Sequence, residues 1–191
     1  LYAARNAAQL EAKRMLVVNY RGYGQSHGKP SQKALFEDAL AVYDYVVGPG
    51  NAGPQDVVVM GRSLGSALAT LLAAKRKVRA VVLITPFDSL AAVAERHYPA
   101  FLVRTLLRHP FRSDELAPQA QVPALFLIAE QDHIVPPPHA YSLVRVWGGP
   151  THTRAFEGVG HNDIETHPAY HRELNAFLRQ QASSALRRLK G

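Results

Sequence analysis

The sequence around Ser63 constrains the fold more than any other stretch. An apolar, β-branched run at 57–60 leads directly into Gly61-Arg62-Ser63-Leu64-Gly65, and an Ala- and Leu-rich segment follows. This pattern predicts a buried strand, a sharp turn and a helix. The two glycines let strand and helix approach closely, so the turn holds the Ser63 hydroxyl clear of the backbone. An isolated Gly-x-Ser-x-Gly is often an ordinary glycine-rich turn, and only the flanking strand and helix favour a nucleophile.

Apolar runs alternate with helical patterns along the rest of the chain. The predicted strands cover 15–19, 57–60, 81–84, 123–129 and 151–156, and the predicted helices cover 2–13, 31–46, 64–75, 89–97, 100–108, 136–146 and 168–189. Strands separated by helices at this rhythm indicate βαβ crossovers and a mostly parallel sheet flanked by helices. Because 191 residues suit one substantial core, we expect a single α/β domain over residues 1–191.

Composition excludes several classes of protein. The chain has no cysteine, which rules out disulfides, thiolate catalysis and Cys-based zinc sites. No apolar run is long enough for a membrane span, so we expect no transmembrane segment. A net charge of +7 raises the question of nucleic acid, but the arginines are scattered and the one compact basic run, 187–190, ends a predicted helix. We therefore expect no nucleic acid partner.

The first residues carry little information about compartment. Residues 1–5 lack an initiator Met and also lack the charged-then-apolar layout of a signal peptide, so we expect the start to be internal to a longer chain. The compartment is unknown from sequence, with the cytoplasm slightly favoured.

Three candidate catalytic residues follow predicted strands. Functional side chains of doubly wound sheets collect beyond the carboxyl ends of strands, and Ser63, Asp132 and His161 each occupy such a position. A serine hydroxyl needs a histidine to accept its proton, and the histidine needs a carboxylate to fix its tautomer and stabilise the imidazolium. The three positions therefore predict a Ser-His-Asp triad.

Each of these residues also has a structural interpretation. Asp132 can offer its carboxylate to backbone N–H groups at a helix start, and His161, one of nine histidines, can be an ordinary surface or turn residue. Asp88 also follows a strand and is the rival acid, although a capping role for the next helix suits it better. His167 and His171 have a spacing found in metal sites, but no third ligand is evident and a solvated helix face is the simpler interpretation.

The motifs together resemble those of the α/β-hydrolase family, and within it the small-lid members related to Bem46 and to serine aminopeptidase-like hydrolases. The matching stretches are 19–26, 61–67, 85–90, 129–136 and 160–163, in the family's order. The resemblance implies that Ser63 is the nucleophile, His161 the general base and acid, and Asp132 the orienting acid. It also implies that the backbone N–H of Leu64 is one oxyanion-hole donor.

The resemblance is incomplete at the N-terminal end. Family members have further strands before the first helix, and a His-Gly turn after their third strand supplies the second oxyanion donor. In the family's sheet that strand lies between those matching 15–19 and 57–60. We therefore expect the C-terminal portion of a longer hydrolase, a fold without its N-terminal strands, with backbone groups left open beside 57–60.

The expected reaction is acyl transfer to water through an acyl-enzyme on Ser63, with no metal or cofactor. The substrate is a small-molecule or peptide ester, thioester or amide, and the sequence does not choose among these bonds. Tyr23, Phe87 and Tyr98 are predicted substrate-binding residues, with core packing as the alternative. A minimal helical lid is predicted at 88–112. The alternative function is a non-catalytic protein that binds a ligand or partner on a hydrolase fold. Oligomeric state is unknown from sequence.

Overall fold

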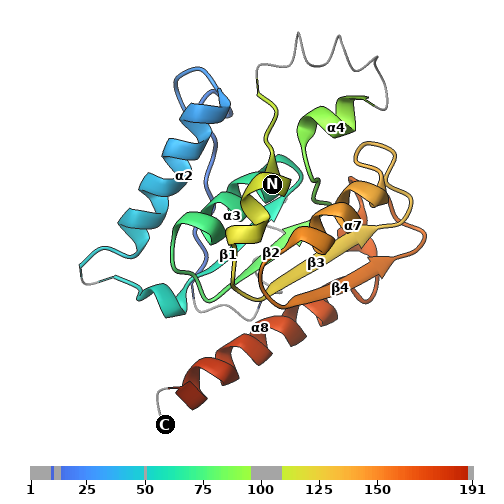
Figure 1. Ribbon diagram of the computed structural model, residues 1–191. Coiled ribbons are helices and arrows are strands. Elements are labelled where there is room, and N and C mark those ends of the chain that lie inside the picture. The colour runs from blue at the N-terminus through green and yellow to red at the C-terminus, as the bar shows by residue number, and fades with distance from the viewer. Residues whose placement is uncertain (1–9, 11–13, 50, 96–108, 189–191) are drawn as a thin grey trace.

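The computed structural model describes residues 10, 14–49, 51–95 and 109–188. Within them lies a four-stranded parallel sheet with helices on both of its faces (Figure 1). The strands are β1 (Val58–Arg62), β2 (Ala80–Ile84), β3 (Ala124–Ala129) and β4 (Thr151–Phe156), and they lie side by side in that order. The predicted parallel sheet flanked by helices is thus confirmed.

The helices follow the strands as βαβ crossovers require. The α-helices among the described residues are α2 (Gln32–Val46), α3 (Leu64–Lys75), α4 (Leu90–Glu95), α6 (Ser113–Leu116), α7 (Pro137–Val146) and α8 (Tyr170–Arg188). Short 3₁₀ helices lie at η1 (Pro54–Asp56), η2 (Ala117–Gln119) and η3 (Ile164–Thr166). Among the described residues, no helix is both long enough and apolar enough to cross a membrane.

The core lies in two layers because successive strand residues face opposite sides of the sheet. Val81 and Leu83 pack in a cluster with residues of α3 and α7, whereas Val82 and Ile84 pack in a cluster with residues of α8. In Figure 1, α8 accordingly lies on the other side of the sheet from α3 and α7. Since both faces are covered, every residue of β2 and β3 is buried.

The strand predicted at 15–19 is not formed, and this prediction is wrong. Residues 14–20 have no strand pairing, and the side chains of Leu16 and Val17 are 60% and 54% exposed. An apolar run becomes a buried strand only when a neighbouring strand takes up its backbone N–H and C=O groups. No strand in the described part of the chain lies along 15–19. Within that part β1 is an edge strand, and Met60 is 37% exposed.

Some predicted features lie outside the described residues. They are the helix at 100–108, the helix at 2–13 apart from Leu10, residues 96–97 of the helix at 89–97, and Tyr98. Of the predicted lid at 88–112, the structure describes 88–95, which includes α4, and 109–112.

Candidate active site

Ser63 lies at the sharp turn between β1 and α3. Its backbone has φ +50° and ψ −119°, a combination that non-glycine residues rarely adopt. A methyl group on Gly61 would collide with the carbonyl group of Gly65, so this close approach of strand and helix requires glycine. The Ser63 N–H donates to the carbonyl of Ile84 at 2.9 Å, which continues the β1–β2 ladder up to the turn.

The Ser63 side chain does not cap α3. Its hydroxyl oxygen instead lies 3.0 Å from Nε2 of His161, which comes from the loop after β4. Nδ1 of His161 lies 2.7 Å from Oδ2 of Asp132, which comes from the loop after β3. The structure thus brings the three predicted residues into one hydrogen-bonded chain, from the carboxyl ends of three strands.

Asp132 is almost completely buried, with its side chain 2% exposed. Its Oδ1 accepts hydrogen bonds from the backbone N–H groups of Ile134 at 2.9 Å and Val135 at 2.7 Å, which compensate the carboxylate for its lost water. Its Oδ2 remains for His161. The backbone-binding and histidine-binding interpretations of Asp132 are therefore both realised, with one oxygen for each.

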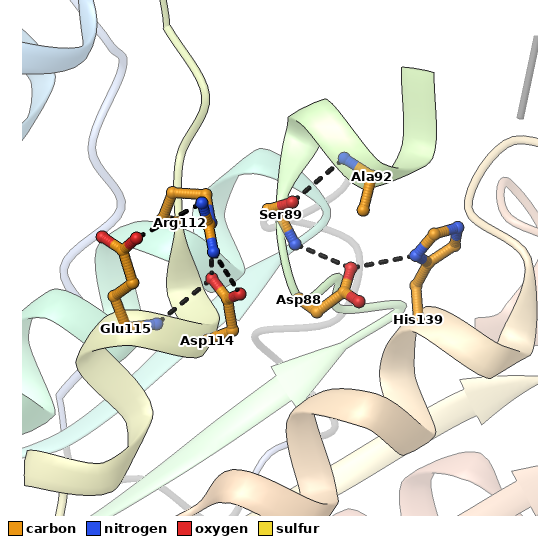
Figure 2. Close-up of polar contacts among 7 residues, drawn as sticks. All are labelled: Asp88, Ser89, Ala92, Arg112, Asp114, Glu115 and His139. Carbon is orange, nitrogen blue, oxygen red and sulfur yellow. Dashed lines mark hydrogen bonds and ion pairs between the residues drawn. The ribbon is translucent and has the colours of Figure 1, made fainter. Parts of the chain in front are cut away.

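The rival acid, Asp88, has a different histidine as its partner (Figure 2). Its Oδ1 lies 2.9 Å from Nδ1 of His139 and accepts from the N–H of Ser89 at 2.7 Å. Its backbone carbonyl accepts from the N–H of Asp114. Asp88 thus joins the end of β2 to the starts of α4, α6 and α7, whereas Asp132 faces His161.

The predicted substrate-binding residues lie in different environments. Tyr23 is 54% exposed and makes an edge-to-face contact with Tyr20, with 6.3 Å between ring centroids. Phe87 is 1% exposed, in a core cluster that includes Leu68 and Val135. Tyr98 lies outside the described residues. His167 and His171 belong to no group of three metal-ligating side chains in the part of the chain that the structure describes.

Arg62 and Tyr20 also lie near the turn at Ser63, and neither was among the predicted site residues. Arg62 donates from Nη2 to the main-chain carbonyl of His161, and its Nη1 lies 3.8 Å from Oε2 of Glu165. The Tyr20 hydroxyl lies against the first turn of α3, where a methyl group on Gly65 would be 2.8 Å from it. Burial raises the pKa of Tyr20. Both residues are part of quoted motifs, but a motif does not give their partners.

The first turn of α3 directly follows Ser63, and the amino end of a helix is where backbone N–H groups can meet a ligand. The first N–H groups of any helix lack intrahelical acceptors, and the helix dipole favours negative charge at that end. Leu64, which was predicted to donate to an oxyanion, is the first residue of α3 and directly follows Ser63.

A shallow surface depression lined by residues 73–78, 119, 121 and 122 lies at the opposite, amino end of the strands.

Comparison with known proteins gives consistent results. A family model described as alpha/beta hydrolase fold matches residues 3–116. An uncharacterized protein of Mycobacterium tuberculosis is 38% identical over 151 residues, which are 79% of this chain and 54% of that protein. Protein bem46 of Schizosaccharomyces pombe is 29% identical over 170 residues, 86% of this chain and 57% of its own length. The chain spans about half the length of the curated relatives that it matches.

Two solved structures are similar in fold. An acetyl xylan esterase from Paenibacillus sp. R4 has a TM-score of 0.64 at 20% identity, over 79% of this chain and 52% of its own. A puromycin hydrolase has a TM-score of 0.64 at 24% identity, over 78% of this chain and 25% of its own. At these identities the likeness concerns the fold alone. The resemblance to Bem46 and its family that the sequence motifs indicated is confirmed.

Proposed function

We propose that this chain, which belongs to the alpha/beta hydrolase fold family, carries the catalytic site of a serine hydrolase. The observation that carries the proposal is the hydrogen-bonded chain from Ser63 Oγ through His161 to the buried carboxylate of Asp132, with distances of 3.0 and 2.7 Å. A buried carboxylate that faces Nδ1 favours the tautomer with the proton on Nδ1. Nε2 is then an acceptor for the serine proton.

In the proposed reaction Ser63 Oγ attacks the substrate carbonyl carbon while Nε2 of His161 takes the hydroxyl proton. Asp132 stabilises the resulting imidazolium through Nδ1–H, and the Leu64 N–H stabilises the oxyanion of the tetrahedral intermediate. His161 then gives its proton to the leaving group as the acyl-enzyme forms. Water attacks the acyl-enzyme with His161 as general base, which releases the acid and restores Ser63.

The proposed substrates are acyl compounds with an ester, thioester or amide bond, either small molecules or peptides. One structural neighbour is named as an esterase and the other as a puromycin hydrolase; their fold agrees with the proposal, but their names do not select the bond for this chain. A triad on this fold serves all three bonds, so the bond is to be determined by assay.

Labelling with a fluorophosphonate probe tests the proposal, because such probes react with activated serines. We expect the protein to be labelled, Ser63→Ala to lose the label, and Ser142→Ala to keep it, since Ser142 lies on α7 and bonds Arg145. Hydrolysis of activated esters, thioesters and anilides then ranks the bonds. Removal of a triad serine costs on the order of 10⁶-fold in kcat. Absence of a Ser63-dependent label would reject the enzyme in favour of a binding protein on a hydrolase fold.

A further inference from the structure

We infer that Arg62 is a positioning residue, which holds the backbone of His161 so that Nε2 faces Ser63. This inference rests on the proposed function, in which His161 moves the proton. Arg62 directly precedes Ser63 in the chain, and its guanidinium reaches the main-chain carbonyl of His161. The nucleophile and the base, 98 residues apart in sequence, are therefore joined by a link that starts one residue from the nucleophile.

The loop that carries His161 is also anchored by the core, because Val159 is buried in one cluster with Phe156 and Ile164. The loop contains two glycines, and Gly158 has φ +76°, a left-handed conformation that favours glycine. The Gln131 N–H donates to the carbonyl of Val159 at 3.1 Å, which ties the loop to the Asp132 side of the site. Arg62 provides the corresponding link to the Ser63 side. Together the two bonds hold the loop of His161 between Asp132 and Ser63.

A link through the main chain differs from the bonds of the imidazole itself. The Nε2–Ser63 bond is broken and remade as the proton moves, and the Nδ1 bond goes to the side chain of Asp132. The carbonyl–guanidinium bond takes no part in proton transfer, so it can hold His161 in place throughout the reaction. An imidazole displaced by about 1 Å from its productive position can cost about 100-fold in rate.

Glu165 forms a longer ion pair with the guanidinium of Arg62. Its Oε2 is buried without a hydrogen bond and lies 3.8 Å from Arg62 Nη1. The two side chains are 20% and 24% exposed, so solvent screens their attraction less than it screens a fully exposed pair. Glu165 belongs to η3, a few residues after His161, so the planar fork of Arg62 spans two points of one segment. A lysine could reach one of them at a time.

The test compares Arg62→Ala and Arg62→Lys with a matched control, Arg79→Ala. Arg79 has the same 20% exposure and likewise bonds a backbone carbonyl and a carboxylate, those of Gln55 and Asp56, but at the amino end of the strands. All variants are first checked for folding by circular dichroism. With an activated ester, we expect Arg62→Ala to lose about 100-fold in kcat with little change in KM. Arg62→Lys should lose less, methylguanidinium should restore part of the Arg62→Ala rate, and Arg79→Ala should retain wild-type kcat.

A second readout does not depend on turnover. The proton between His161 Nδ1 and Asp132 should give a downfield ¹H NMR signal, assigned by its absence in His161→Gln. We expect this signal to be lost or broadened in Arg62→Ala and kept in Arg62→Lys and Arg79→Ala. An unchanged signal and kcat in Arg62→Ala, or equal losses in Arg62→Ala and Arg79→Ala, would overturn the inference. If the wild type takes no fluorophosphonate label, the proposed function fails, and the NMR comparison still decides whether Arg62 positions His161.

Discussion

Asp132 and Asp88 are both carboxylates at strand ends, yet they face different histidines. Oδ2 of Asp132 faces His161, whereas Oδ1 of Asp88 faces His139. Their sequence positions alone left both as candidate acids. The pairing separates them, because an orienting acid has to bond the nitrogen opposite the one that takes the serine proton.

Asp132→Asn should therefore reduce kcat far more than Asp88→Asn. An asparagine carbonyl still accepts from the N–H groups of Ile134 and Val135, so the loop is retained, but its amide group facing His161 favours the wrong tautomer. We expect a loss on the order of 10⁴-fold for Asp132→Asn. Steady-state kinetics of both variants on one ester provides the measurement. Equal losses would contradict the assignment.

At the scale of elements, an ion pair joins the segment before α2 to α2 itself. Arg21 follows the irregular stretch 14–20, and its Nε donates to Oδ2 of Asp38 on α2 at 2.6 Å. This hydrogen bond holds the pKa of the Asp38 carboxyl below its usual value near 3.8. The same segment includes Tyr20, which contacts the first turn of α3. The ion pair thus links α2 to the surroundings of Ser63.

The lowered pKa of Asp38 fixes the direction of a pH effect. The stability that the ionised Asp38 carboxylate contributes is complete above the unfolded-state pKa and is lost as pH falls through the lower folded-state pKa. Because both side chains are more than a third exposed, we expect Asp38→Asn to cost less than about 1 kcal/mol at pH 6 and less again at pH 2. Urea unfolding at the two pH values measures this, with Glu37→Gln as control. A constant difference between wild type and Asp38→Asn would be evidence against the effect.

The elements predicted correctly are those with local signals. The turn residues at 61–65 delimit β1 and α3, and proline opens α7, so the predicted helix at 64–75 coincides with α3 and that at 136–146 lies within one residue of α7. The strand at 15–19 failed because pairing depends on a neighbour distant in sequence. The contacts of Arg62 and Asp88 were missed for the same reason, since their partners lie 99 and 51 residues away.

At the scale of the whole molecule, the central strands of the sheet are shielded from solvent more completely than its edge strands. All residues of β2 and β3 are buried between neighbouring strands, whereas β1 and β4 are edges of the described sheet. The Ser63 N–H bonds the carbonyl of Ile84, and the Val57 carbonyl accepts from the N–H of Arg79, so both residues direct their backbone groups toward β2. Because alternate residues of a strand direct these groups to opposite sides, the N–H and C=O groups of Val58 and Met60 lie on the outer side of β1. That side is open to any strand that pairs there.

Amide hydrogen exchange should therefore be slowest in β2 and β3 and faster at Val58 and Met60 of β1. Buried, fully paired amides open only with the core, while edge amides exchange through smaller fluctuations. Mass spectrometry with peptides covering the four strands measures the ranking. Protection of Val58 and Met60 equal to that of β2 would mean that another strand covers the outer side of β1.

The backbone of Ser63 has a consequence for the molecule's thermal resistance. A non-glycine residue with φ +50° and ψ −119° costs about 1–3 kcal/mol, which glycine avoids. Substitution of Ser63 by glycine would relieve this strain but remove the hydroxyl that faces His161. Stability and the proposed chemistry are thus opposed at a single position. Directed evolution for heat resistance alone would favour losing the hydroxyl, so such a search has to hold residue 63 fixed.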